Sequence, residues 1–256
     1  FKDRDDYASA FQTAADQTKK GLFVWGDDER LQKIHPKTAK KYTYGLKDSD
    51  DFQAFDVVKT TEGAKFHVRA NGEDLGEFTI HLFGDHNVMN ATAVIAIAFT
   101  EGIDLDVVRK GLVKYTGAKR RFSEKDFGDT VVIDDYAHHP TELRATIQAA
   151  RQKFPDRKLV TIFQPHTYSR TKEFEEEYVE ILRGVDKAFL TPIYGSAREA
   201  AGDIKSEDIA RQIPGAEVID FDNLKDLLAY KGDCIVFMGA GDIPKYEVAF
   251  EEMLGK

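Results

Sequence analysis

Acidic, aromatic and imidazole side chains follow an apolar run in the middle of this chain. The run Val131–Ile133 is β-branched, which is typical of a buried strand, and residues 134–142 read Asp-Asp-Tyr-Ala-His-His-Pro-Thr-Glu. Pro140 suits the first position of a helix, so the polar residues are expected at the carboxyl end of the strand. Open α/β sheets bind ligands at that end, and the segment therefore predicts a binding or catalytic site.

Two interpretations of this segment differ in what its polar groups do. An aspartate in a strand-to-helix turn often only caps the helix, and a histidine pair in a loop is often only solvated. Because neighbouring side chains on extended backbone point to opposite faces, one residue of each pair is expected to face a ligand. We assign Asp135 to a ligand hydroxyl, and His138 to a hydrogen bond or an anionic group, from their donor and acceptor chemistry.

A second segment with chemistry opens a predicted helix. In Gly84–Ala91, Asp85 is expected to cap the helix, and His86 and Asn90 lie four residues apart on one face, beside Asn87. An asparagine amide carries both a donor and an acceptor, which matches the edge of a purine base. The alternative is that these side chains only cap and solvate the helix.

A third segment follows the next apolar strand. Residues 164–171 read Gln-Pro-His-Thr-Tyr-Ser-Arg-Thr, in which His166 and Arg170 could clamp a carboxylate. Ser169 or Thr171 is expected to cap the helix that comes next. Two later loops, one with Arg198 and one with a Gly-Ala-Gly sequence at residues 239–241, offer a further cation and backbone N–H groups for an anion.

These segments resemble motifs of the Mur ligases of peptidoglycan synthesis. The similarity is carried by Asp-Asp-Tyr-Ala-His-His-Pro-Thr-Glu, Gly-x-His-Asn-x-x-Asn-Ala, Lys-Arg-Arg-Phe and Gln-Pro-His-x-Tyr-Ser-Arg-Thr, the last being most like the alanine-adding members. The resemblance implies nucleotide contacts from His86, Asn87, Asn90, Arg121 and Asp135. It also implies contacts to the amino acid and the acyl phosphate from Tyr136, His138, His166, Arg170 and Arg198, with His138 and Arg170 catalytic.

The activity that the resemblance implies is an ATP-dependent ligation. L-alanine would be joined to UDP-N-acetylmuramate through an acyl phosphate, with Mg²⁺ held by residues expected upstream of this chain. Family members hold the triphosphate in a loop of the form G-x-x-x-x-G-K-[ST], and these 256 residues contain none. The chain also begins at Phe1 and not at Met, so we expect it to be an inactive part of a longer enzyme.

The predicted fold is α/β with two domains. Residues 1–119 are expected to be the later part of the family's central ATP-binding domain, with a small antiparallel sheet formed by the alternating segments between Lys41 and Phe83. Residues 120–256 alternate strand and helix, which predicts a Rossmann-like, mostly parallel C-terminal domain. Its predicted elements include strands over 159–163 and 234–238 and helices over 171–183 and 223–229. The boundary is placed at Lys119–Arg121, three cations that are either a solvated surface or a contact for phosphates.

Composition limits the possible partners and the compartment. A net charge of −9 without a basic stripe argues against nucleic acid, and no apolar stretch is long enough to cross a membrane. The single cysteine, Cys234, lies in an apolar run and is expected to be buried. We therefore expect a cytoplasmic protein, and the sequence does not predict its oligomeric state.

Three alternatives remain open from the residues. Murein tripeptide ligase has a similar Asp-x-Ala-His-His-Pro-Thr core, but the segment 164–171 argues against it. A metal-dependent hydrolase would use Asp135, His138 and His166 as ligands. A non-catalytic binding module is compatible with the missing phosphate loop.

Overall fold

The computed structural model describes residues 4–197 and 199–255, and it divides into two compact units, residues 1–116 and 117–256. Each unit has its own sheet and its own apolar core. The two units are described separately below. Among the described helices, none has the length and apolar character that crossing a membrane requires.

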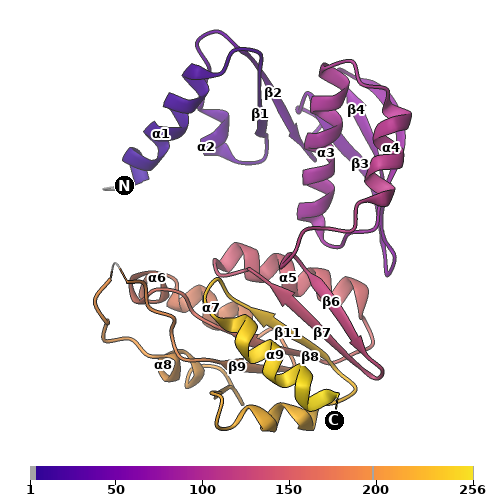
Figure 1. Cartoon of the computed structure of the whole chain (residues 1–256). Coiled ribbons are helices and arrows are strands. Elements are labelled where there is room, and N and C mark those ends of the chain that lie inside the picture. Colours follow the sequence, from indigo (N-terminus) through magenta and orange to yellow (C-terminus); the bar gives the residue numbers. More distant parts are fainter. Residues whose placement is uncertain (1–3, 198, 256) are drawn as a thin grey trace. The chain divides into compact units, whose positions relative to one another are not determined.

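Unit 1 contains a five-stranded sheet in the order β1-β2-β3-β4-β5 (Figure 1). Its elements are α1 (Arg4–Gln17), β1 (Gly21–Trp25), α2 (Glu29–Gln32), β2 (Lys40–Gly45), β3 (Phe52–Thr60), β4 (Gly63–Ala70), β5 (Glu73–Ile80), α3 (Asp85–Thr100) and α4 (Leu105–Lys114). The β3-β4-β5 part is antiparallel, as predicted. Helix α3 packs on the sheet, with Val88 and Ile95 in the same core as Phe52 and Phe66.

The antiparallel prediction is wrong for the segment 41–44. Strand β2 pairs in parallel with β1 and with β3. At the end of the connection between β2 and β3, the Asp51 carboxylate accepts hydrogen bonds from the N–H and the hydroxyl of Thr43 at 2.8 and 3.1 Å. The chain then enters β3 in the same direction as β2.

Unit 2 contains a six-stranded sheet in the order β10-β9-β8-β11-β7-β6 (Figure 1). Its elements are β6 (Ser123–Phe127), β7 (Thr130–Asp135), α5 (Pro140–Lys153), β8 (Leu159–Phe163), α6 (Tyr168–Glu173), α7 (Glu175–Leu182), β9 (Lys187–Leu190), α8 (Ser206–Ala210), β10 (Glu217–Val218), η1 (Leu224–Tyr230), β11 (Cys234–Met238) and α9 (Ile243–Leu254). Strands β7 to β11 pair in parallel, and β6 is an antiparallel edge strand. The predicted Rossmann-like α/β fold is confirmed.

Helices cover both faces of this sheet. One core contains Leu143 of α5 and Tyr178 of α7, packed with the strand residues Ile133 and Val236. The opposite core contains Phe250 of α9, with alternate residues of the same strands such as Val132, Val160 and Ile235. Buried strands thus carry apolar residues on both sides, which explains their largely apolar sequence. Cys234 is buried in the first core, as expected.

The register of the central strands brings three loops to one edge. Met238 at the end of β11 lies opposite both Asp135 at the end of β7 and Phe163 at the end of β8. The loops that follow these strands therefore start side by side, at the carboxyl edge where parallel sheets bind ligands.

Two predicted helices differ from expectation. The single helix expected over 171–183 is divided at Phe174, whose ψ of 21° ends α6 and whose ring packs edge-on against His139 at 4.7 Å. The segment expected as a helix over 223–229 is a 3-10 helix, η1. In both cases the packing against the rest of unit 2 decides the local backbone.

Candidate functional site

The two aspartates at the end of β7 serve opposite faces of the sheet. Asp134 pairs with Arg120, with 3.1 Å between Oδ2 and Nε. Asp135 accepts hydrogen bonds from the backbone N–H groups of Phe122 and Ala137, each at 2.8 Å. Both carboxyl groups are buried, and burial raises the pKa of each. Asp135 therefore fixes the turn of residues 120–122 onto the strand end, and any ligand hydroxyl would have to use its remaining lone pairs.

Tyr136 carries two cations above its ring. The guanidinium carbon of Arg120 lies 4.9 Å from the ring centroid, and that of Arg121 lies 5.6 Å away. Arg120 also donates to the carbonyl oxygen of Gly239 at 2.7 Å, so its charge serves the fold. Arg121 is exposed and forms no ion pair with the described residues, which leaves it available to an anionic ligand.

The two histidines of the pair make different contacts. His139 is the N-cap of α5, and its Nδ1 accepts a hydrogen bond from the N–H of Thr141 at 3.3 Å. His138 is half-buried on the other side of the turn, and its ring centroid lies 6.0 Å from that of His166. The two rings thus have different neighbours, His166 for His138 and Phe174 for His139.

Glu142 fixes the backbone of this turn, although it is not among the predicted site residues. Its Oε2 accepts hydrogen bonds from the N–H groups of His138 and His139, at 3.0 and 3.1 Å. Burial disfavours its charged form, but these hydrogen bonds outweigh burial and lower the pKa of Glu142. The signal was present in the sequence, because a glutamate at the third helical position completes a capping box.

His166 and Arg170 lie together after β8. The Nη1 of Arg170 is 3.5 Å from the Nδ1 of His166, and the His166 ring stacks on Tyr194 at 5.7 Å and 17°. Burial, and then the charge of Arg170, lower the pKa of His166, so its ring is neutral at pH 7. Arg170 is half-buried and makes no ion pair within the described residues. A half-buried guanidinium of this kind, beside neutral rings, suits a carboxylate or phosphate.

The helix that carries Arg170 is capped from another loop. Thr167 is its N-cap, with a φ of 67° and no side-chain cap bond. The Glu199 carboxylate accepts from the N–H groups of Tyr168 and Ser169 at 2.8 and 2.7 Å. The prediction that Ser169 or Thr171 caps this helix is therefore wrong, because a distant carboxylate occupies the position. Arg198, predicted to bind substrate, lies outside the described residues.

The two glycines after β11 are explained by close packing. A Cβ on Gly241 would lie 2.4 Å from Cγ of Tyr194 and 2.5 Å from Oε1 of Gln164. Gln164 is buried and bridges the loops, since its Nε2 donates to Asp242 at 2.8 Å and its Oε1 accepts from the N–H of Ile243 at 2.9 Å. These contacts give the glycines a structural reason, whether or not an anion also binds there.

The predicted adenine-binding residues lie on the first turns of α3, in unit 1. Gly84 is the N-cap, and Asp85 pairs with Lys59 at 2.9 Å, so the prediction that Asp85 caps the helix is wrong. The Nδ2 of Asn87 donates to the carbonyl oxygen of Phe83 at 2.7 Å and lies 3.1 Å from Nε2 of His86. Asn90 is exposed one turn further on. His86, Asn87 and Asn90 are thus grouped on one helix, and the unit 2 residues form a separate group.

The donor geometry does not favour the metal-dependent hydrolase. Within the described part of the chain, no three His, Cys, Asp or Glu side chains are arranged to hold a metal ion. Asp135 directs both oxygens to backbone N–H groups, and His138 contacts Glu142 and the Tyr136 carbonyl oxygen. These groups therefore do not converge with His166 on one point.

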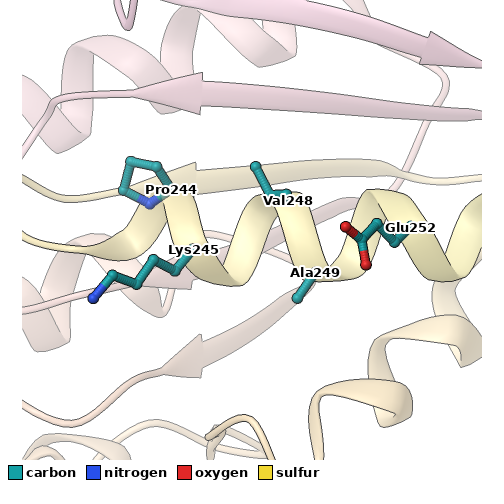
Figure 2. Close-up of a pocket in the computed structure, with 5 residues that line it drawn as sticks. All are labelled: Pro244, Lys245, Val248, Ala249 and Glu252. Atoms are coloured by element: carbon teal, nitrogen blue, oxygen red, sulfur yellow. The ribbon is translucent and has the colours of Figure 1, made fainter.

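A shallow hollow lies away from these residues, along α9. Figure 2 shows its lining side chains on the helix, and all come from α9: Pro244, Lys245, Val248, Ala249 and Glu252. None of them belongs to the predicted site. The chemistry is instead gathered at the ends of β7 and β8.

Family comparisons agree with these motifs. The model of the Mur ligase middle domain matches residues 1–98, and that of the Mur ligase glutamate ligase domain matches residues 120–241. The chain belongs to the Mur ligase family. It therefore carries parts of two Mur ligase domains, and the fold of unit 2 is that of the family's second matched domain.

Two curated relatives of this Mur ligase chain are both described as UDP-N-acetylmuramate–L-alanine ligases. The chain is 99% identical over 256 residues to the one from Lactobacillus delbrueckii subsp. bulgaricus, and it covers 58% of that protein. It is 68% identical over 254 residues to the enzyme of the same description from Lactobacillus helveticus, again covering 58%. The chain thus spans less than two thirds of the length of the curated relatives that it matches.

Solved structures show the same arrangement of elements. The crystal structure of a UDP-N-acetylmuramate-alanine ligase from Thermotoga maritima matches with a TM-score of 0.81 and 27% identity, over 99% of this chain and 56% of that chain. A murein peptide ligase from Psychrobacter arcticus matches with a TM-score of 0.67 and 22% identity, over 100% of this chain and 56% of that one. The second likeness shows the fold alone.

Proposed function

We propose that this chain is part of an ATP-dependent ligase that joins L-alanine to the lactyl carboxylate of UDP-N-acetylmuramate. The proposal is supported by the description of its relatives, at 99% and 68% identity, and by the grouping of His138, His166 and Arg170. The whole enzyme would act in the cytoplasm, in the peptidoglycan synthesis on which cell-wall biogenesis, cell shape and cell division depend.

The observation that carries the proposal is the half-buried guanidinium of Arg170. It lies beside His166 and forms no ion pair among the described residues. A guanidinium fork pairs bidentately with a planar carboxylate, so Arg170 would hold the carboxylate of alanine. His166, neutral beside it, would add one hydrogen bond without competing for the negative charge.

Each unit offers its own candidate contacts to a nucleotide. Arg121, exposed and without a described ion pair, fits the charge of a nucleotide, and the Asn87 and Asn90 amides fit an adenine edge. Asp135 would accept one ribose hydroxyl on a remaining lone pair. ATP would supply the phosphoryl group that activates the muramyl carboxylate, with Mg²⁺ held by residues outside this chain.

Catalysis in this arrangement would come from positioning and charge stabilisation. Arg170 and His166 would fix the alanine carboxylate, which leaves its amino group to approach the activated carbonyl carbon near Tyr136 and His138. No side chain needs to form a covalent bond to substrate. Arg198 would add a further cation for the substrate.

A binding defect specific to alanine tests this function. In an enzyme with the full length of the relatives, we expect alanine-dependent phosphate release from ATP in the presence of UDP-N-acetylmuramate. Arg170→Met should raise KM for alanine by about 10- to 100-fold, since a charge-assisted bidentate pair is worth roughly 1.5–3 kcal/mol. Arg170→Lys should recover only part of this loss, because an ammonium lacks the planar fork.

Lys172→Met is the matched control. Lys172 is an exposed cation on the same helix, and its loss should leave KM for alanine within twofold of wild type. An equal effect of Arg170→Met and Lys172→Met would show that Arg170 does not bind the amino acid. Absence of any alanine-dependent turnover in the wild-type enzyme would refute the function itself.

A further inference from the structure

His138 is held at every polar atom except one. Its backbone N–H donates to Oε2 of Glu142 at 3.0 Å, and its backbone carbonyl oxygen accepts from the hydroxyl of Tyr178 at 2.8 Å. Its Nδ1 lies 3.0 Å from the carbonyl oxygen of Tyr136 and 3.2 Å from Oε2 of Glu142. Within the described residues, no hydrogen bond reaches Nε2. A loop residue fixed this completely suits a role that needs a defined orientation.

The surroundings of Nδ1 decide where the ring carries its proton. Both groups that face Nδ1, a backbone carbonyl and a carboxylate, are acceptors. A neutral imidazole has one N–H donor and one acceptor nitrogen, and the partner of one nitrogen selects the tautomer. The proton therefore belongs on Nδ1 of His138, and the lone pair on Nε2.

Both partners keep the ionisation state that this arrangement needs. The hydrogen bonds from His138 and His139 overcome the effect of burial and lower the pKa of Glu142, so it remains a carboxylate. Burial raises the pKa of Tyr178, so its hydroxyl remains a donor to the His138 carbonyl oxygen. Tyr178 is fully buried in the core below the turn, and it anchors the turn to α7.

We infer that Glu142 and Tyr178 are positioning residues that hold His138 as its Nδ1–H tautomer and present Nε2 as a proton acceptor to the substrate amino group. The role of Nε2 as proton acceptor rests on the proposed function. The amine lone pair forms the new N–C bond, and the C–O bond to phosphate breaks with its electron pair leaving on phosphate. The surplus proton of the nitrogen passes to Nε2, and the Glu142 carboxylate faces the resulting imidazolium.

The tautomer can be measured without any substrate. Long-range ¹H–¹⁵N correlation spectra of the 256-residue chain at pH 8 separate the two nitrogens of a histidine ring, and His138→Gln identifies the His138 signals among the seven histidines. We expect the Nδ1–H form in the wild type. Glu142→Ala should reduce its population at least twofold, whereas Glu142→Gln, which keeps an acceptor oxygen, should retain it.

Tyr178→Phe removes only the hydroxyl and serves if Glu142→Ala does not fold. It should shift the His138 ring signals, because the turn loses its anchor to α7. The control is Glu180→Ala, an exposed carboxylate on α7 that pairs with Arg144 and should leave those signals unchanged. An Nε2–H tautomer in the wild type, or His138 signals unmoved by both Glu142→Ala and Tyr178→Phe, would overturn the inference.

Turnover separates this inference from the proposed function. In an enzyme with the full length of the relatives, Glu142→Gln should lower kcat by about 10-fold or more, because it removes the charge that faces the imidazolium. KM for ATP should change less than twofold. An unchanged kcat would reject the proton-acceptor role while the alanine ligase assignment stood. A wild-type enzyme without alanine-dependent turnover would reject that assignment, and the tautomer measurement would still test the positioning.

Discussion

Thr161 in the middle of β8 gives a prediction that depends on a single hydroxyl. The residue is fully buried, and its hydroxyl has no hydrogen-bond partner among the described residues. It lies between Val236 of β11 and Ala188 of β9, in the part of the sheet with the least access to water.

The expected gain from Thr161→Val follows from this environment. Leaving a buried hydroxyl unsatisfied costs about 1–3 kcal/mol, and valine has nearly the same shape with a methyl group in its place. The substitution should therefore raise the free energy of unfolding by about 1–2 kcal/mol. For a unit of this size that corresponds to an increase in Tm of roughly 3–6 °C.

The single tryptophan, Trp25, lies in unit 1, so its fluorescence does not report on the unfolding of unit 2. Calorimetry of the chain is therefore the measurement of this change. The control is Thr146→Val on α5 in the same unit, where the hydroxyl donates to the Glu142 carbonyl oxygen at 3.0 Å. That variant should lose about 0.5–1.5 kcal/mol. Equal changes in the two variants, or a loss of stability in Thr161→Val, would show that the Thr161 hydroxyl is satisfied in solution.

Two further predictions concern a buried acid and a close glycine. Burial raises the pKa of Glu247 to about 7 despite its 3.1 Å contact with Lys125, so the folded chain binds this proton more tightly than the unfolded chain. The stability that this proton contributes should be lost as pH rises from about 4.5 to 7, and Glu247→Gln should flatten the slope of Tm against pH in that range. Gly241→Ala places a methyl group 2.4 Å from Cγ of Tyr194 and should displace that ring from His166, seen as a shift of the His166 NMR signals. Gly111→Ala, on α4 of unit 1, places a methyl group with nothing within 4 Å and should leave the His166 signals unmoved.

The central strands of unit 2 could be predicted because their signal is local. Strands β8 and β11 have the predicted bounds, Leu159–Phe163 and Cys234–Met238, since a largely apolar run of this length fits a strand covered on both faces. The loops with His138 and His166 were placed at strand ends for the same reason. Unit 1 was less predictable, because β2 pairs in parallel with its neighbours and a strand's own sequence does not encode its direction.

The site shows the same division between local and tertiary information. The residue types of Asp135, His138, His166 and Arg170, and their position after strands, come from the sequence, as does the family to which they point. The bonds that orient them involve partners distant along the chain: Phe122 with Asp135, Tyr178 with His138, and Glu199 with the helix that carries Arg170. Tertiary structure alone decides these pairs, because they form only once strand order and register have brought separate loops to one edge of the sheet. The sequence by itself therefore determined which chemistry is available, and the packing of unit 2 decided which groups hold the fold and which remain without a partner among the described residues.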